Sequence, residues 1–304
     1  MKILALIEDT LRSRSTTIIV FLSIATFFLL IGVIIAILVD PSSLLQQPAQ
    51  SGGATQQQGT QGGISIDLSS MPQLIRFFEA GLAGFVQFAA LLLAVFATAG
   101  IIPSTLEKGT IDLFLSKPVS RVELLGGRFL GSVFLVFAIT AYFIFGAWLI
   151  ISLKTGYWDP AFLTVILTVT VNFAIMYTVM MALGISTRSS AATIIIVFFY
   201  MYILAPILSG RETGLFAIIS NESIRAFISG IYYFLPKPGE IGSLAGAAIL
   251  GYPVTWMPVP AGEIPAGDAG AIISSASWMP LWSSAIFGVA TYALSMYLLK
   301  NKDF

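Results

Sequence analysis

Residues 17–39 read TIIVFLSIATFFLLIGVIIAILV, an apolar run that contains no charged side chain. A bilayer core about 30 Å thick is crossed by roughly 20 residues of helix, so this run is long enough to span it. Hydrocarbon offers no partner to an unpaired backbone amide or carbonyl, and a run of this kind must therefore be helical. The stretch predicts a membrane-spanning helix.

Five further runs of similar length and composition follow along the chain. They cover residues 80–102, 129–152, 161–184, 190–208 and 279–299. The sequence of 304 residues is 57% hydrophobic and 10% charged, with a mean hydropathy of +0.92, which excludes an ordinary soluble domain. We predict an all-α integral membrane protein in which residues 1–304 form a single transmembrane domain with six spanning helices.

The positions of Lys and Arg indicate how these helices cross the membrane. With the N-terminus inside, the loops on the cytoplasmic side carry Lys2, Arg12, Arg14, Lys108, Lys117, Arg121, Arg128, Arg188, Lys300 and Lys302. The much longer outer loops carry Arg76, Lys154, Arg211, Arg225 and Lys237. Because basic residues beside a span favour the cytoplasm, we expect a multi-pass protein of the cell (cytoplasmic or plasma) membrane with both termini cytoplasmic.

Two segments outside the spans have a distinct composition. Within residues 1–16, the apolar side chains Ile3, Leu4, Ile7 and Leu11 recur at helical spacing between charged ones, which predicts an amphipathic helix lying on membrane lipid. The alternative is a frayed lead-in to the first span. Residues 40–79 include a Gln/Gly/Ser/Thr-rich stretch at 46–63 that cannot bury a core, so we expect a flexible external loop.

Residues 209–278 form the second long outer segment. Its run 213–235 is long enough to span but carries Glu222 and Arg225 in the middle, which would be costly at the bilayer centre. The run 241–260 is apolar but interrupted by Gly and Pro. We expect interfacial or re-entrant helices here, with the region from Gly242 to Met257 helping to close an external gate.

Several functions are excluded by composition. The sequence has no Cys and no His, which removes thiol chemistry, disulfides, the usual metal ligands and Ser-His or Cys-His nucleophile pairs. It has no Gly-Lys pair and hence no phosphate-binding loop of the G-x-x-x-x-G-K-[ST] type. Its net charge of zero gives no reason to expect nucleic acid as a partner. We predict no catalytic residue, cofactor or metal site in this chain.

The predicted spans also lack Asp, Glu, Lys and Arg in their interiors. Proton- or ion-driven transporters place such groups inside the membrane, so a proton-coupled mechanism is disfavoured. The polar side chains that remain include Gln87 in the second run and Asn172 in the fourth. Such residues are more often interhelical hydrogen-bond partners than substrate ligands, and we carry both interpretations, translocation path and interhelical contact.

The loop between the second and third runs, residues 103–128, reads PSTLEKGTIDLFLSKPVSRVELLGGR. Ser104 with Glu107 and Ser120 with Glu123 have the spacing of capping boxes, which start helices. Between them, residues 110–116 predict a short helix that ends at Lys117, because the residue before a proline disfavours the helical conformation. A short projecting helix with this much apolar surface requires a protein groove to cover it.

These residues resemble the signature loop of type-2 ATP-binding-cassette permeases, written E-x-G-T-[hydrophobic]-x-x-[hydrophobic]-L-[ST]-x-P-[hydrophobic]-[ST]-R. The positions in register are Glu107, Gly109, Thr110, Leu115, Ser116, Pro118, Ser120 and Arg121. Six spans, an amphipathic N-terminal helix and a long outer segment before the last span are also similar to the family. The resemblance is specific in the loop and architectural over the remaining chain.

The resemblance implies that this loop docks into a cleft of a separate ATPase subunit, which binds ATP and Mg, and that two permease chains, alike or different, join two ATPases. Lys117 and Arg121 would position the loop on the ATPase. Leu113, Phe114 and Leu115 would supply buried contact. These roles, with the motif residues Glu107, Gly109, Thr110 and Pro118, make up the expected coupling site.

We therefore expect the permease subunit of an ABC exporter, which has no enzyme activity of its own. The alternative is a non-transporting membrane scaffold that recruits a cytosolic partner through the same loop. A membrane enzyme acting on lipids fits less well, because the carboxylates are scattered through loops. A loop that merely touches lipid headgroups remains the plain alternative for residues 107–121.

Overall fold

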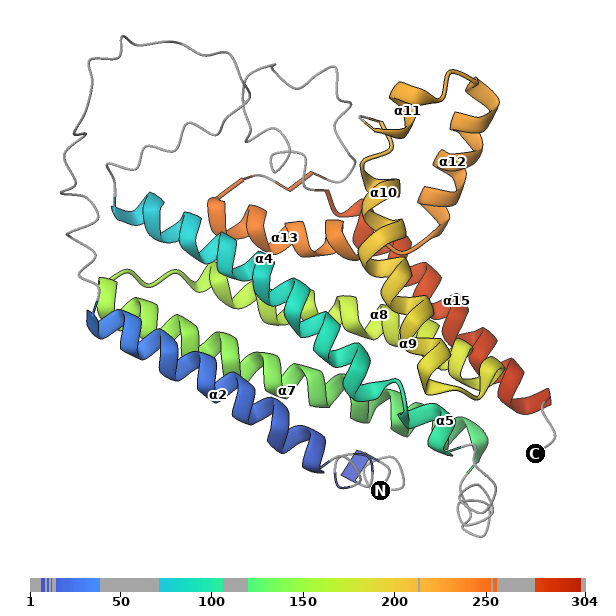
Figure 1. The fold of residues 1–304 in the computed structure, drawn as a ribbon, viewed down its shortest axis with the longest axis horizontal. Helices are drawn as coiled ribbons and strands as arrows, with labels where there is room; N and C mark the ends of the chain where they lie inside the picture. Colours follow the sequence, from blue (N-terminus) through green and yellow to red (C-terminus); the bar gives the residue numbers. More distant parts are fainter. Residues whose placement is uncertain are drawn as a thin grey trace.

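The fold is described from a computed structural model covering residues 15–38, 71–105, 120–212, 214–252, 254–255 and 277–301, with residues 7, 8, 10 and 12 near the N-terminus (Figure 1). The helices are α2 (Ser15–Leu38), α4 (Met71–Thr98), α5 (Ile101–Thr105), α7 (Arg121–Thr155), η1 (Pro160–Leu163), α8 (Thr164–Thr187), α9 (Ser190–Phe199), η2 (Tyr200–Leu204), α10 (Ala205–Ser209), α11 (Leu215–Ile218), α12 (Glu222–Phe234), α13 (Pro238–Leu250) and α15 (Met279–Asn301). Within these ranges no strand forms.

Six helical stretches of the described chain are long and apolar enough to cross a membrane. They are Thr16–Ile35, Ile75–Thr105, Val122–Thr155, Pro160–Thr187, Ser190–Ser209 and Met279–Asn301. Each overlaps one of the predicted apolar runs, and the predicted all-α membrane architecture is confirmed. In Figure 1 the start of α2, the end of α5, the start of α7 and the end of α15 lie at one end of the bundle, here called the terminal end. The opposite end is called the far end.

The second span begins earlier than expected. Residues 71–79, predicted as part of an external loop, form the first turns of α4. Ile75 is buried there while Phe77 and Phe78 are exposed, and the apolar span of the structure begins at Ile75. The prediction of a flexible loop is therefore wrong for residues 71–79, and residues 40–70 lie outside the described residues.

Helix α8 occupies the centre of the bundle and packs against α4, α7, α9, α13 and α15 (Figure 1). Its side chains Val169, Phe173, Tyr177 and Met181 are completely buried. Helices in a membrane associate through close packing, because lipid tails are as apolar as the side chains themselves. A helix that is apolar on all sides and enclosed by five others is the expected centre of such a bundle.

Close approach of α2 to α7 depends on Gly146. A Cβ atom at this position would lie 2.8 Å from a methyl group of Leu29 on α2, closer than real side chains pack. Glycine removes that atom and lets the two helices touch, as small residues commonly do between membrane helices. The α2–α7 pair forms one side of the bundle in Figure 1.

At the far end, the run 213–235 does not form one helix. The side chain of Asn221 accepts hydrogen bonds from the backbone amides of Ser223 and Ile224, so a new helix, α12, begins at Glu222. The guanidinium of Arg225 donates to the carbonyls of Ile219 and Phe216. Both charged residues that argued against a span thus belong to a capped, separate helix that projects from the far end (Figure 1).

Helix α13 returns from α12 into the bundle, where it packs against α4, α8 and η1. Its side chains Ile241, Ala247 and Ile249 are completely buried. Gly251, in the left-handed conformation with a φ of 77°, ends the helix. The run 241–260 thus forms a helix, α13, over its described first half, and the prediction that this helix is interfacial or re-entrant stays a prediction.

Candidate functional site

The predicted coupling residues lie almost entirely outside the described residues. Glu107, Gly109, Thr110, Leu113, Phe114, Leu115, Lys117 and Pro118 fall within residues 106–119. Arg121 is the first residue of α7. The described chain shows what holds the two ends of this segment, α5 before it and α7 after it.

The capping box predicted at Ser120 is confirmed. Ser120 has extended backbone, its hydroxyl accepts a hydrogen bond from the Glu123 amide at 3.1 Å, and the Glu123 carboxylate accepts one from the Ser120 amide at 2.8 Å. Two amides that helix geometry leaves unpaired are thereby satisfied. Helix α7 thus has a fixed start directly after residues 106–119, which carry most of the predicted coupling residues and are called here the predicted coupling segment.

The capping box predicted at Ser104 is not formed as expected, because Ser104 lies inside α5 and its hydroxyl donates to the Ile101 carbonyl. The second span continues to Thr105 before the coupling segment begins. Ile102 and Pro103 pack on Gly184 of α8, where a Cβ atom would be 3.3 Å from Pro103. Both ends of the segment are therefore anchored to the bundle.

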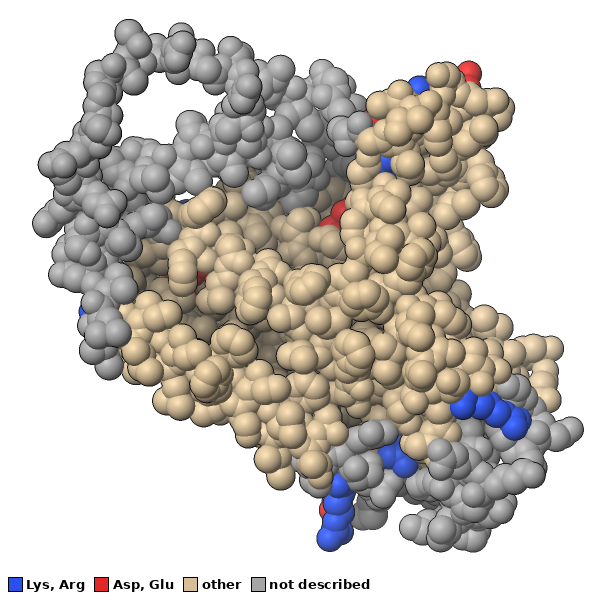
Figure 2. Space-filling model, viewed as in Figure 1, with Lys and Arg blue, Asp and Glu red and all other residues tan. Residues whose placement is uncertain are grey.

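The N-terminal residues reach the same region. Residues 7, 8, 10 and 12 are helical, Glu8 and Arg12 are exposed, and Thr10 is buried. Arg128 on α7 is also buried and donates a hydrogen bond from Nη1 to the Thr10 hydroxyl at 3.1 Å. The described part of the predicted N-terminal helix is thus held against α7. Figure 2 shows Lys and Arg side chains along this lower edge, whereas the middle of the visible face is nearly free of charge.

Gln87 and Asn172 both lie against the first half of α13. The Asn172 amide, completely buried on α8, donates to the Pro238 carbonyl at 2.8 Å. Gln87 on α4 lies against Gly242, where a Cβ atom would be 2.7 Å from its Cγ. The amide atoms of Gln87 are buried and have no hydrogen-bond partner in the described structure. The two side chains thus lie where α13 packs against α4 and α8.

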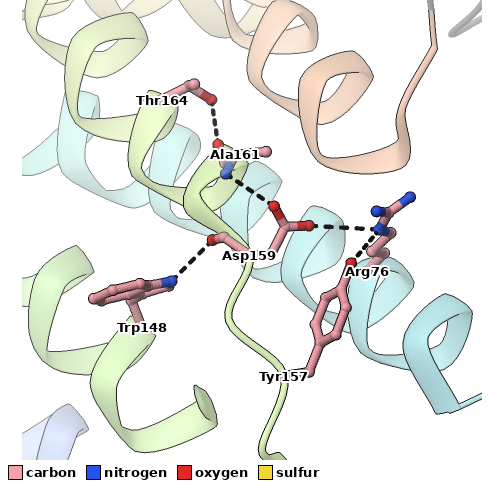
Figure 3. A network of polar contacts seen from close by, with 6 residues as sticks. All are labelled: Arg76, Trp148, Tyr157, Asp159, Ala161 and Thr164. Carbon is pink, nitrogen blue, oxygen red and sulfur yellow. Dashed lines mark hydrogen bonds and ion pairs between the residues drawn. The ribbon is translucent and has the colours of Figure 1, made fainter.

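A polar network at the far end, which sequence reasoning missed, joins α4 to the turn between α7 and η1 (Figure 3). Arg76 Nε donates to the Tyr157 hydroxyl at 2.9 Å and lies 3.5 Å from Asp159 Oδ2. Asp159 Oδ1 accepts from the Ala161 amide at 2.9 Å, which caps η1. The Trp148 indole donates to the Asp159 carbonyl at 2.8 Å. Asp159 is therefore fixed on both its carboxylate and its backbone.

Glu79 lies one turn after Arg76 on α4. It is completely buried, and neither of its carboxylate oxygens has a hydrogen-bond partner in the described chain. Glu79 lies inside the second span of the structure, Ile75–Thr105, whereas the predicted run 80–102 begins just after it. The boundary predicted between the outer loop and the second span thus lies directly after Glu79. The available signal was the Arg76–Glu79 pair at helical spacing among apolar residues.

A second polar cluster at the far end ties α12, α13 and α15 together. Lys237 is buried, and its ammonium group donates to the Leu235 carbonyl at 3.2 Å and to the Ser283 hydroxyl at 2.9 Å. The Tyr232 hydroxyl donates to Glu240. Burial lowers the pKa of Lys237 and raises the pKa of the Tyr232 hydroxyl. Each group has partners, which indicates a structural role.

An apolar cavity of about 280 Å³ lies between α2, α4 and α7. Its lining includes Phe28 of α2, Phe85 of α4 and Phe143 of α7, and Thr140 supplies a hydroxyl. A cavity of this composition suits hydrocarbon chains rather than polar groups. It lies among helices that are long enough to cross the membrane.

The comparison with protein families gives one match. A model described as "ABC-2 family transporter protein" covers residues 7–304, nearly the whole chain. The chain belongs to the ABC-2 transporter family. Among curated proteins, no sequence matches it. This ABC-2 permease is thus a multi-pass component of membrane transport.

Proposed function

We propose that this ABC-2 permease is the membrane subunit of an exporter, driven by separate ATPase subunits that bind ATP and Mg and dock on residues 107–121. The observation that carries the proposal is the E-x-G-T to S-R pattern of this segment, placed between two helix ends that the bundle holds firmly. In the proposed orientation the terminal end faces the cytoplasm and the far end faces outward. Two permease chains would form the transport path.

Helix α7 provides a route for the motion. It starts at the capping box beside the coupling segment and runs for 35 residues, about 50 Å at 1.5 Å per residue. Gly156 and Tyr157 follow its end and lead directly to Asp159, which pairs with α4. A displacement of the coupling segment would therefore move the Asp159 turn at the far end.

Helix α5 provides a second connection, from the segment to the central helix α8 through Pro103 and Gly184. Helix α8 in turn contacts α13 through the hydrogen bond from the Asn172 amide to the Pro238 carbonyl. ATP-driven closure of the ATPases would act on both paths and open or close the far end around α13. An apolar or amphipathic molecule fits the apolar cavity between α2, α4 and α7.

The test is purification of the tagged chain from its own host, beside a Phe114→Asp, Arg121→Glu double variant. A matched control is Arg188→Glu, which reverses an exposed charge on the turn between α8 and α9. We expect an ATPase with a phosphate-binding loop to accompany the native chain and the control but not the double variant. Retention of the ATPase by the double variant would refute the docking assignment. An ATPase that binds the permease but hydrolyses ATP at the same rate with and without it would favour the scaffold alternative.

A further inference from the structure

Glu79 is a buried acid that takes no part in the coupling mechanism proposed above. Its side chain is completely enclosed, and both carboxylate oxygens lack a hydrogen-bond partner among the described residues. A buried ionised carboxylate without partners is strongly disfavoured, and such a group takes up a proton instead. The packing therefore fits the neutral acid.

The nearby charges do not balance the charge that Glu79 would carry if it were ionised. Among the described residues, the charged groups that act on Glu79 are Arg76 and Asp159. Arg76 is engaged with Asp159 and with the Tyr157 hydroxyl, so its positive charge is already matched by one carboxylate. Two carboxylates and one guanidinium leave one negative charge, and a proton on Glu79 makes the cluster neutral.

Other titratable groups in the described part of the elements packed near α4 have partners of their own or are exposed. Tyr142 is bonded to Thr26, Tyr177 is stacked on Phe173, Tyr202 is bonded to the Phe88 carbonyl, Glu240 to Tyr232 and Ser209, Glu123 to Ser120, and Arg128 to Thr10, while Lys154 is exposed. Among the described residues, moreover, no group of three or more acidic, His or Cys side chains gathers to hold a metal ion. A proton is the cation that an enclosed carboxyl can bind without further ligands.

We propose that Glu79 is a proton-binding site that links the closed arrangement of the far end to pH. Three elements meet there: α4 with Arg76 and Glu79, the turn with Tyr157 and Asp159, and the end of α13 at Gly251, where a Cβ would lie 3.6 Å from Arg76 Nη1. Separation of α4 from the turn breaks the Arg76–Asp159 pair and brings water to Glu79. The proton then passes from the carboxyl to water, leaving a hydrated carboxylate.

The direction of the effect follows from proton counting. The closed arrangement holds one proton on Glu79, and the open arrangement releases it, because a hydrated glutamate is ionised at neutral pH. Raising the pH therefore favours the open arrangement, and lowering it favours the closed one. The proposal rests on the proposed function for its role in transport, but the site itself can be tested on the permease alone.

The experiment uses the full chain in lipid without an ATPase, so failure of the export proposal does not affect it. Infrared spectra recorded across a pH titration report protonated carboxyl groups, and Glu79→Gln identifies the contribution of Glu79. Because the sequence has no cysteine, Ser152→Cys, at a completely buried position near the end of α7, provides a unique thiol for a water-soluble reagent. Glu222→Gln, at an exposed acid on α12, is the matched control.

We expect a protonated-carboxyl band at neutral pH that Glu79→Gln removes and Glu222→Gln leaves in place. Labelling of the Ser152→Cys thiol should rise with pH more steeply than ionisation of the thiol alone explains, because the thiolate is the reactive form. Glu79→Gln, which mimics the neutral acid, should reduce the rise to that of thiol ionisation alone. Absence of the band at neutral pH in the unaltered chain overturns the proposal, whether or not the variant folds. An unchanged pH response of labelling in Glu79→Gln also overturns it.

Discussion

Replacing Gly242 with alanine tests whether close packing of α13 on α4 holds α13 in place. The added Cβ would lie 2.7 Å from Gln87 Cγ and 3.2 Å from its Cδ. Carbon atoms pack best at about 3.5–4.0 Å, so either α13 or Gln87 must move by up to about 1 Å. Overpacking of this kind costs about 1–3 kcal/mol, which corresponds to a roughly 5- to 150-fold rise in the undocked population of α13.

The matched control is Gly246→Ala, one turn further along the same helix. A Cβ at Gly246 meets no atom within 4 Å. Both substitutions gain the helix preference of alanine over glycine, worth about 1 kcal/mol, so the difference between them isolates the contact with Gln87. Hydrogen exchange of the amides in residues 238–250, with thermal unfolding of the purified chain, measures that difference.

We expect faster exchange and a lower unfolding temperature for Gly242→Ala than for Gly246→Ala. Adding Gln87→Ala to Gly242→Ala should recover most of the loss, because it removes the atoms that the new methyl group meets. Equal stability of the two alanine variants would refute the reasoning, and so would a loss that Gln87→Ala fails to relieve.

Three further predictions follow from hydrogen bonds and charges. Asp159→Ala removes the η1 cap and the Arg76 ion pair and should lower the unfolding temperature; loss of the cap alone costs about 1–2 kcal/mol of stability. Asp159→Asn should keep the cap and therefore lose less stability. Ser120→Ala should cost about 1 kcal/mol at the start of α7, measured as faster amide exchange in its first turn. Burial lowers the pKa of Lys237 below 10.5 in the folded chain, so in the alkaline range just below pH 10.5 the unfolded chain binds more protons at this residue than the folded chain does. The stability of the fold should therefore rise with pH in that range. Lys237→Met should remove this rise, measured as the unfolding temperature at several pH values.

The membrane spans could be predicted because a stretch of about 20 apolar residues without charge has few other structures available to it. The break of the run 213–235 was also visible, since Glu222 and Arg225 fall where a crossing helix would bury them. Asn221 fixes the new helix start through hydrogen bonds to backbone amides, and this local signal explains why α12 begins at Glu222.

The far-end network was missed for a physical reason. Hydropathy treats Arg76 and Glu79 as the edge of a loop, whereas α4 extends to Met71, buries Glu79 and places the half-buried Arg76 beside Asp159. The partner of Arg76, Asp159, is 83 residues away in the sequence, and no local pattern pairs them. The role of Gly242 likewise depends on its neighbour Gln87 on another helix, which a single sequence does not reveal.

The central claim is that residues 107–121 couple this permease to an ATPase. The most direct measurement is the rate of ATP hydrolysis by the co-purified complex in lipid, compared with the same ATPase alone and with the Phe114→Asp, Arg121→Glu permease added. The account predicts that the native permease changes the hydrolysis rate and that the double variant leaves the ATPase at its unassisted rate. A rate that is the same with the native permease, with the double variant and with no permease would contradict it.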